Sequence, residues 1–382
     1  MAKLRAEGLY KVFGRRSDEA VSKLEGGADR DELRANGTTA AVIDASFAVD
    51  EGQIFVVMGL SGSGKSTLLR MLNGLLEPTA GRVLFDDDDL TALSPRDLRQ
   101  VRSHKISMVF QHFALFPHRS VLENAAYGLE VQGVPREERI RRATEALELV
   151  GLAGWEKSWP DELSGGMQQR VGLARALATD ADLLLMDESF SALDPLIRRD
   201  MQDQLLQLQK RLKKTIVFIT HDLNEAMRLG DHIAVMRDGR IVQIGTAEDI
   251  LVTPANDYVA SFTQDVDRSR VLTAGAIMAE SSEVLGTETD DGTALRTEQD
   301  VLAAAPATVT TDTPIIELFG PCSRSGVAVA VTGDDGGLVG VVTRARLLAV
   351  LGDPDTGPDG VMPPGGGGPD VPQAAKKVIT GA

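Results

Sequence analysis

The chain has 382 residues, 43% hydrophobic and 25% charged, which is typical of soluble globular proteins and allows two or three domains. Its net charge of −16 (40 basic against 56 acidic residues) disfavours a nucleic acid as partner, because such binding depends on clustered basic groups. The single cysteine, Cys322, excludes an internal disulfide and fits a reducing cytosol, and no signal peptide or apolar run of about 20 residues is recognised, so a membrane role is expected only through a partner.

The polar, glycine-containing residues 15–39 interrupt the first expected strands, and their composition indicates a solvated loop or a short helix. Apolar runs then alternate with segments of helical period. The expected strands are residues 54–58, 106–110, 183–186, 215–220 and 232–236. The expected helices are residues 66–73, 136–150, 167–178 and 195–212. This alternation predicts an α/β fold with a mainly parallel sheet.

The apolar periodicity weakens near residue 265, which predicts the end of a first domain covering residues 1–265. We expect a linker or the remnant of a truncated domain at 266–299, and a small α/β domain at 300–352. The tail at 353–382 is rich in Gly, Pro and Asp and is expected to be disordered. Residues 266–382 contain 16 acidic and 8 basic side chains, a net charge of −8, so half of the negative charge lies in this part.

A glycine-rich loop, GLSGSGKST, lies between the expected strand at 54–58 and the helix that follows. Backbone N–H groups of such a loop surround phosphates, and the start of the helix adds its positive dipole end. Lys65 is placed to reach the β- and γ-phosphates, and the Ser66 hydroxyl to bind Mg²⁺. The expected ATP-binding residues of the loop are Gly59, Ser61, Gly62, Ser63, Gly64, Lys65, Ser66 and Thr67.

Two carboxylates, Asp187 and Glu188, follow the apolar run at 183–186 and emerge at the sheet edge where ligands of open α/β sheets bind. We expect Asp187 to hold Mg²⁺ through water and Glu188 to polarise the attacking water. Gln111 and His221 also follow strands; they are candidates for contacting Mg²⁺ and water, and for contacting the γ-phosphate and Glu188, respectively. By itself a His or Gln at a strand end is usually structural.

Residues 1 to about 265 resemble the nucleotide-binding domain of ABC transporters. The resemblance rests on seven features in this order along the chain: Phe13, GLSGSGKST, Gln111, LSGGMQQR, LLLMDE, SALD and His221. The resemblance implies a P-loop ABC ATPase fold with a mainly parallel sheet, an antiparallel β subdomain and a helical subdomain at about 112–162. It also implies a head-to-tail homodimer that binds two ATP molecules with Mg²⁺ at its interface. Integral membrane permease subunits and, indirectly, a substrate-binding protein are the implied partners at the cytoplasmic face of the membrane.

The same resemblance implies the role of each site residue. Phe13 would stack on adenine, and Asp194 would be the aspartate of the D-loop, which faces the second chain. The implied catalytic residues are Glu188, His221 and Gln111. The implied Mg²⁺ ligands are Ser66, Gln111 and Asp187. The implied signature residues, which contact the ATP of the partner chain, are Ser164, Gly165, Gly166 and Gln168.

Longer stretches, among them PDELSGGMQQRVGLARALA and SALDPLIRRDMQ, and also the insert at 15–39, resemble the ATPase subunit of glycine betaine/proline importers. This implies ATP-driven uptake of such osmolytes. Ser189 stands where the resemblance leads us to expect alanine, and serine is small enough for activity to survive.

The C-terminal part resembles a reduced pair of CBS domains. Residues 271–280 look like the entry to a first, truncated domain, and a single CBS unit ends near residue 351. Nucleotide-binding CBS units usually carry a carboxylate three residues after the Thr of a motif like GVVT, whereas here Arg346 follows Thr343. We therefore expect a dimerising or ionic-strength-responsive appendage rather than an adenylate site.

Three alternatives remain open. A soluble ABC protein of DNA repair or translation is opposed by the single cassette and the acidic charge. A non-catalytic nucleotide sensor is opposed by the presence of Lys65, Glu188 and His221. An importer of another amino acid or small solute is the hardest to exclude, because the cassette never touches the cargo.

Overall fold

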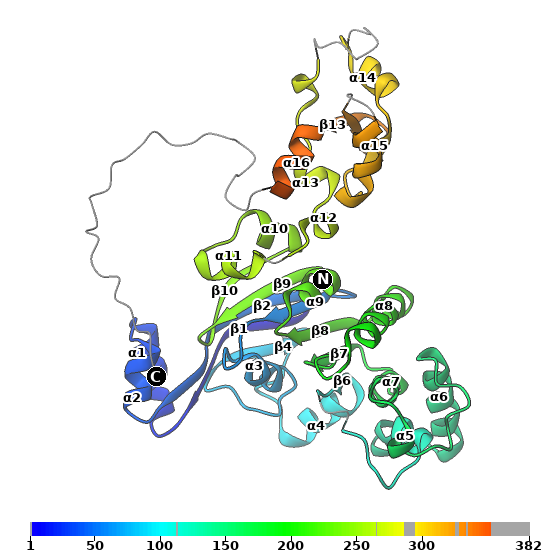
Figure 1. Cartoon of the computed structure of the whole chain (residues 1–382). Helices are drawn as coiled ribbons and strands as arrows, with labels where there is room; N and C mark the ends of the chain where they lie inside the picture. The colour runs from blue at the N-terminus through cyan, green and yellow to red at the C-terminus, as the bar shows by residue number, and fades with distance from the viewer. Residues whose placement is uncertain are drawn as a thin grey trace, which may run out of the picture. The chain divides into compact units, whose positions relative to one another are not determined.

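The computed structural model describes residues 2–111, 114–264, 266–285, 295–324, 328–333 and 335–352. These residues form two compact units, divided between Leu272 and Thr273 (Figure 1). The first unit thus extends beyond the boundary that we expected near 265. The tail at 353–382, expected to be disordered, lies outside the described residues.

A six-stranded sheet forms the centre of the first unit, in the order β10-β9-β3-β8-β7-β6. Its strands are β3 (Ile54–Met58), β6 (Ile106–Val109), β7 (Leu183–Asp187), β8 (Thr215–Thr220), β9 (His232–Arg237) and β10 (Arg240–Gly245). Every neighbouring pair is parallel except β9 and β10. The predicted parallel sheet is confirmed, and each of the five expected strands ends within one residue of its expected limit, whereas β10 was not predicted.

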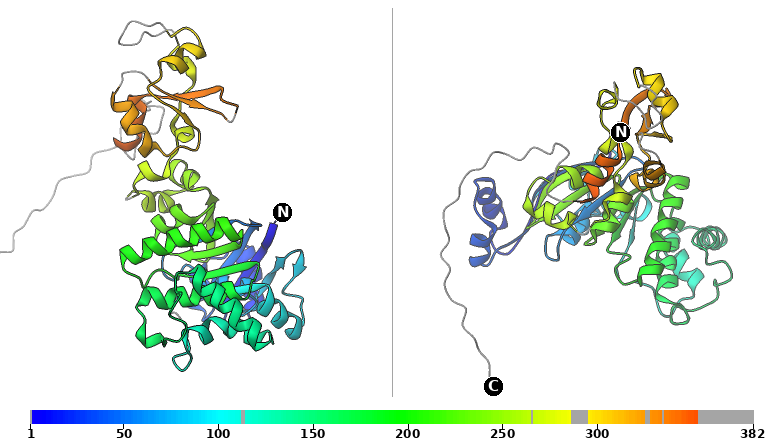
Figure 2. Two further views of the ribbon diagram at one scale, coloured as in Figure 1. Left: turned by 90° about the vertical axis from the view of Figure 1, so that its right-hand side faces the viewer. Right: turned by 45° about the horizontal axis from the view of Figure 1, so that its top comes forward.

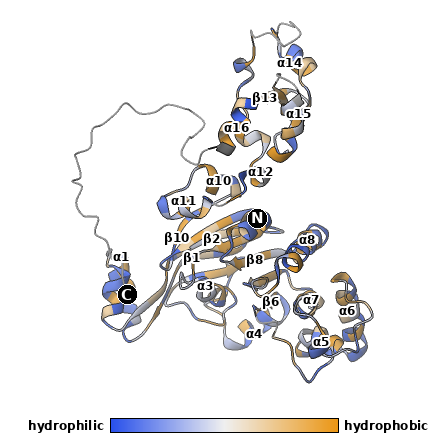
Figure 3. Ribbon diagram, viewed as in Figure 1, coloured by the Kyte–Doolittle hydropathy of each residue, from blue (hydrophilic) through white to orange (hydrophobic). Residues whose placement is uncertain are grey.

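A second, antiparallel sheet has the order β2-β1-β4-β5. Its strands are β1 (Ala2–Phe13), β2 (Thr39–Asp50), β4 (Ala80–Phe85) and β5 (Asp88–Asp89). In β2 most buried residues alternate with exposed ones, so this strand does not read as a continuous apolar run. The two sheets share one hydrophobic core, in which the rings of Phe47 and Phe55 stack with centroids 4.8 Å apart. The central strands carry mostly hydrophobic residues, whereas the helices show both faces (Figure 3).

Helices surround the six-stranded sheet. They are α3 (Lys65–Leu72), α4 (Pro95–His104), α5 (Val121–Val131), α6 (Arg136–Leu149), α7 (Gly165–Ala178), α8 (Pro195–Leu212), α9 (Leu223–Leu229), α10 (Ala247–Val252), α11 (Asp257–Thr263) and α12 (Arg268–Val271). Helices α5, α6 and α7 pack on one another to form the helical subdomain, the teal to green helices of Figure 2. All four expected helices are present, with small differences at their ends.

The polar insert folds into two helices, α1 (Ser17–Glu25) and α2 (Arg30–Ala35), between the long strands β1 and β2 (Figure 1). Val21, Leu24 and Leu33 are buried in a small core with Tyr10 of β1. The expectation of a solvated loop was therefore wrong, and that of a short helix was closer. The apolar side chains at helical spacing hold the insert on the strands despite its polar composition.

The second unit is built on a three-stranded sheet in the order β11-β12-β13. Its elements are α13 (Ala274–Ile277), η2 (Ser281–Glu283), α14 (Glu298–Ala304), β11 (Thr308–Thr310), η3 (Ile315–Leu318), α15 (Phe319–Arg324), β12 (Val329–Thr332), β13 (Leu338–Val342) and α16 (Arg344–Gly352). Strand β12 is parallel to β11 and antiparallel to β13. Among the described residues, no helix in either unit combines the length and apolarity that a membrane crossing requires.

The segment that follows Leu272 is bonded to the second unit. Ala279 and Val341 exchange two backbone hydrogen bonds of 2.8 and 2.9 Å, and Ala274 N donates to Thr313 O at 2.7 Å. These bonds make residues 273–279 part of the second unit, whereas a linker would leave such groups to water. Arg346, at the position where a carboxylate would hold ribose, donates to Glu283 Oε1 at 3.0 Å. Cys322 is buried, which raises the pKa of its thiol and agrees with an inert role.

Candidate active site

The glycine-rich loop joins β3 to α3 and is shaped by three glycines with positive φ, Gly59, Gly62 and Gly64. A Cβ on Gly64 would lie 2.2 Å from Ala41 O, and one on Gly59 would lie 2.3 Å from Met236 O. Neighbouring backbone therefore excludes side chains at these two positions. Gly64 is also the N-cap of α3 and has no side chain to cap it, which leaves the first N–H groups of the helix for an anion.

Lys65 lies at the bottom of this loop and is only 4% exposed. Its Nζ donates to Gly59 O at 2.8 Å and to Leu60 O at 3.1 Å, and lies 3.7 Å from Glu188 Oε1. Burial lowers the pKa of Lys65, and the neighbouring carboxylates act in the opposite direction. The loop thus holds a desolvated cation where the phosphates are expected.

The Ser66 hydroxyl donates to Asp187 Oδ1 at 3.1 Å. Burial raises the pKa of the Asp187 carboxyl, and the bond from Ser66 opposes that rise. A hydroxyl and a partly buried carboxylate side by side are the oxygen donors that Mg²⁺ prefers, so this pair fits the ion. Gln111 is brought to the same edge of the sheet, where its Nε2 donates to Ser191 Oγ at 3.3 Å.

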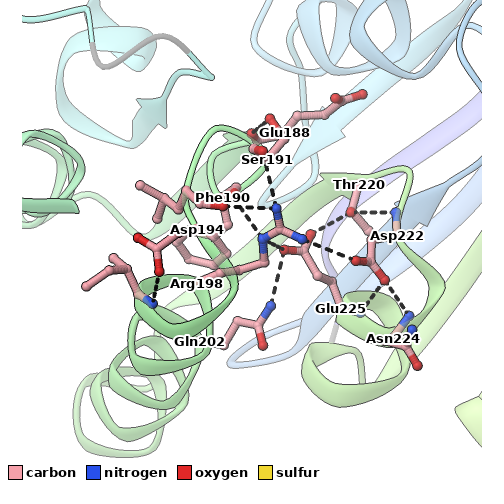
Figure 4. Close-up of polar contacts among 12 residues, drawn as sticks. Glu188, Phe190, Ser191, Asp194, Arg198, Gln202, Thr220, Asp222, Asn224 and Glu225 are labelled. Carbon is pink, nitrogen blue, oxygen red and sulfur yellow. Dashed lines mark hydrogen bonds and ion pairs between the residues drawn. The ribbon is translucent and has the colours of Figure 1, made fainter. Parts of the chain in front are cut away.

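His221 and Glu188 meet directly, with 3.0 Å between His221 Nδ1 and Glu188 Oε2. The backbone of Glu188 is left-handed, with φ 43°, and is fixed from both sides. Its N–H donates to Ile219 O at 3.0 Å, and its carbonyl accepts from Ser191 Oγ at 2.8 Å. The carboxylate is thereby held at the edge of the sheet in an orientation set by the histidine (Figure 4 shows Glu188 beside Ser191).

The signature turn begins α7. Ser164 is the N-cap of this helix, and its Oγ accepts from Met167 N at 3.3 Å, which leaves the hydroxyl proton for another acceptor. A Cβ on Gly166 would lie 2.6 Å from Ile197 Cγ2, so packing on α8 also favours glycine there. Gln168 Nε2 donates to Pro160 O and Leu163 O of its own chain, at 2.9 and 3.3 Å.

Phe13 and Asp194 lie apart from this cluster. Phe13 is exposed at the end of β1, with Lys11 Nζ 5.3 Å from its ring centroid. Asp194 caps α8, where its Oδ1 accepts from Leu196 N and Ile197 N at 3.2 and 3.1 Å. Among the described residues, direct side-chain bonds join the loop lysine and serine to Asp187, Glu188 and His221, but do not extend to Phe13, Ser164 or Asp194.

Sequence reasoning missed two residues that brace the phosphate loop. Arg30 of the insert donates to Asp238 Oδ1 at 3.0 Å and to Gly62 O at 3.5 Å. Tyr258 of α11 donates to Met236 O at 3.3 Å, and the Arg237 guanidinium lies 4.6 Å from the centroid of its ring. No local pattern marks Arg30, because its role depends on the insert folding back onto the loop.

Ser189, the residue found where alanine was expected, leads to a stability prediction. Its Oγ is buried without a hydrogen-bond partner, and the side chain is 1% exposed. We expect Ser189→Ala to raise the free energy of unfolding by about 1 kcal/mol, because it removes an unsatisfied buried hydroxyl, and to leave ATP hydrolysis unchanged. Thermal unfolding and a phosphate-release assay measure the two effects.

The matched control is Ser191→Ala, which removes a hydroxyl that donates to Glu188 O and accepts from Gln111. It should lower the melting temperature where Ser189→Ala raises it. A lower melting temperature for Ser189→Ala would mean that this hydroxyl has a stabilising partner.

Two parts of the chain match models of known protein families. A family model described as "ABC transporter" matches residues 42–191, and one described as "CBS domain" matches residues 299–353. The first match includes the phosphate loop, Gln111, the signature turn and both carboxylates. The second covers most of the three-stranded unit.

Curated relatives match over nearly the whole chain. The glycine betaine transport ATP-binding protein OpuAA of Bacillus subtilis (strain 168) is 49% identical, and the match covers 91% of this chain and 92% of the relative. The glycine betaine/carnitine transport ATP-binding protein GbuA of Listeria monocytogenes (serotype 1/2a) is 47% identical, covering 92% and 98%. ProV of Escherichia coli (strain K12), a glycine betaine/proline betaine transport ATP-binding protein, is 46% identical, covering 91% and 97%.

Solved structures agree with the fold. The dimeric structure of MJ0796, a bacterial ABC transporter cassette, is 31% identical, with a TM-score of 0.54, and the match covers 64% of this chain and 98% of that one. A structure of the same cassette in a post-hydrolysis state with ADP and Pi gives the same TM-score, identity and coverage.

Proposed function

Because this chain belongs to the family of ABC transporter ATP-binding proteins, we propose that it is the ATPase subunit of an importer for glycine betaine or a related quaternary amine. The extent of the similarity carries this proposal. The glycine betaine relatives match 91 to 92% of the chain, and so reach into the second unit. A methionine import protein of Rhodococcus jostii is 48% identical, but over 61% of the chain.

The residues at the phosphate loop and at the ends of β7 and β8 have separate roles in ATP hydrolysis. The N–H groups at the start of α3 and the Lys65 ammonium bind the phosphates. Glu188, oriented by His221, accepts a hydrogen bond from the attacking water and draws its proton. Ser66 and Asp187 would hold Mg²⁺, which when bound neutralises charge on the β- and γ-phosphates.

A second copy of the chain would complete each site. The Ser164 hydroxyl proton and the N–H groups at the start of α7 would bind the γ-phosphate held by the other chain. Leu196, two residues after Asp194, is 71% exposed, which fits a surface that a second copy covers. The dimeric cassette among the similar structures supports the same arrangement.

We propose that the permease docks on the helical subdomain. A groove of about 280 Å³ lies between α5 and the strand β6, and its lining includes Leu75, Phe110, Tyr127 and Val131. Leu75 and Val131 are among the most exposed apolar side chains of the unit. An apolar helix of an integral membrane subunit fits this groove, and it would hold the chain at the cytoplasmic face of the membrane.

Placing a charge in this groove should separate transport from hydrolysis. Val131 is 60% exposed, so Val131→Asp is expected to fold and to keep the ATPase rate of the isolated chain. It should lower co-purification with the permease, and ATP-driven uptake, by about tenfold or more, because docking would bury the new carboxylate. The control is Val252→Asp on α10, at a similarly exposed valine outside the groove. Wild-type uptake by Val131→Asp would exclude the groove as the docking site.

The cargo is tested with the permease and binding protein reconstituted in liposomes with this chain. Uptake of labelled glycine betaine should require internal ATP and exceed uptake of methionine. Preferential transport of methionine or another amino acid would contradict the assignment of cargo and leave the ATPase function intact.

A further inference from the structure

Arg198, in the first turns of α8, gathers the loop that follows β7. Its guanidinium donates to three main-chain carbonyls of that loop (Figure 4). Nε donates to Phe190 O at 3.2 Å, and one terminal nitrogen, Nη2, donates to Ser191 O at 3.3 Å and Leu193 O at 3.1 Å. The loop begins at Glu188 and ends at Asp194, so a single side chain fixes the backbone between the two.

The same guanidinium also faces the loop that follows β8. Nη1 lies 3.5 Å from Asp222 Oδ2, and Nε lies 3.8 Å from Glu225 Oε1. Asp222 is the residue after His221, and its Oδ1 caps α9 by accepting from Asn224 N at 2.8 Å. Arg198 therefore connects the segment that carries Glu188 to the segment that carries His221.

Glu225 of α9 is the second carboxylate that faces the Arg198 guanidinium. It is 4% exposed and accepts from Thr220 Oγ1 at 2.6 Å and from Gln202 Nε2 at 3.1 Å. Burial raises the pKa of the Glu225 carboxyl, and the bonds from Thr220 and Gln202 and the charge of Arg198 oppose that rise. The positive charge of Arg198 offsets part of the cost of burying this carboxyl group, and the carboxyl group in turn attracts the guanidinium.

We propose that Arg198 is a positioning residue that keeps the loop from Glu188 to Asp194 in register with His221. The hydrogen bond between His221 and Glu188 then forms in the same arrangement that presents Asp194 to a second chain. Hydrolysis in one site is thereby tied to the geometry of the interface. This inference rests on the proposed ATPase function and extends it to how the two sites are coupled.

The planar fork of arginine is essential to the proposal. Arginine has five N–H donors in fixed directions, and the contacts described here engage three carbonyls and two carboxylates at once. Lysine keeps the positive charge beside Glu225 but offers a single donor group, so it cannot span both loops. Arg198→Lys should therefore preserve the fold but no longer hold the loop from Glu188 to Asp194 in place relative to His221. Arg198→Ala also leaves a buried carboxylate without its cation.

The experiment uses the full chain and the variant Arg198→Lys, with Arg198→Ala beside it. Fluorescent ATP analogue titration gives the dissociation constant, and phosphate release gives kcat and the Hill coefficient for ATP. Arg198→Lys should bind ATP within about twofold of the unaltered chain, because the phosphate loop is untouched. Its kcat should fall about tenfold or more, and its Hill coefficient should approach 1. Free guanidinium should restore part of the kcat of Arg198→Ala if that variant folds.

The matched control is Arg199→Lys, the exposed neighbour on the same helix, which should behave as the unaltered chain. Unchanged kcat and cooperativity in Arg198→Lys, beside an active unaltered chain, would overturn the inference alone. A loss of kcat that follows only the unfolded fraction, measured by thermal unfolding, would also overturn it in favour of a structural role. Absence of ATP hydrolysis by the unaltered chain would overturn this inference and the proposed function together.

Discussion

Replacing Glu188 by Gln is expected to lower ATP turnover about a thousandfold while leaving ATP binding intact. The amide has the shape of the carboxylate and keeps a neighbour in His221, whose Nδ1 lies 3.0 Å from Glu188 Oε2. It cannot draw a proton from water, and a positioned general base contributes about 10²- to 10⁴-fold to such a rate. The phosphate loop and Lys65 are unchanged, so bound ATP should persist and hold two chains together.

Phosphate release measures turnover, and size-exclusion chromatography with ATP and Mg²⁺ measures the dimer. The control is Glu148→Gln, an exposed glutamate on α6, which should match the unaltered chain in both assays. Rapid turnover by Glu188→Gln would contradict the role of this carboxylate. A variant that is inactive but stays monomeric with ATP would instead contradict the shared nucleotide site.

The parallel sheet and the phosphate loop could be predicted because their signals are local. Strand β8 is buried at all six positions, so it reads as one apolar run whatever its neighbours are. In the loop that begins at Gly59 the backbone lies so close to neighbouring backbone that only glycine fits, and these glycines are visible in the sequence. The carboxylates at the end of β7 follow from the same rule of sheet edges.

Features that depend on distant contacts could not be predicted. The composition of the insert indicated a solvated segment, because its few apolar residues form a core only together with Tyr10 and Ile43 of the adjacent strands. The backbone partners of residues 273–279, Thr313 and Val341, are far along the chain, so the sequence alone does not show how this segment is bonded. Arg30 and Arg198 carry no sequence signal for the same reason.

Several residues that are expected, from the resemblance, to contact the second chain also have a structural role within their own chain. Asp194 caps α8, Gly166 gives room to Ile197, and Gln168 ties two carbonyls of the preceding loop. A substitution at any of these would disturb the local turn as well as the interface. Loss of activity there is therefore weaker proof of the shared site than loss at a residue with one role.

Replacing Lys65 by Ala is expected to weaken ATP binding by about 10- to 100-fold. A hydrogen bond to a charged group contributes about 1.5–3 kcal/mol, and every 1.4 kcal/mol is a tenfold change in affinity. The ammonium has two carbonyl partners and a carboxylate in its own chain, and these groups compete with the phosphates for it. This competition keeps the expected effect near the middle of that range.

ATP and ADP affinities of Lys65→Ala can be compared by titration with fluorescent analogues, with the exposed Lys23→Ala as control. ADP affinity should fall less than ATP affinity, because the lysine reaches both the β- and the γ-phosphate. Equal losses for the two nucleotides would mean that Lys65 shapes the loop through Gly59 and Leu60 rather than binding the terminal phosphate. Unchanged affinity for both would remove the phosphate loop from the site, and with it the hydrolysis mechanism built on Glu188.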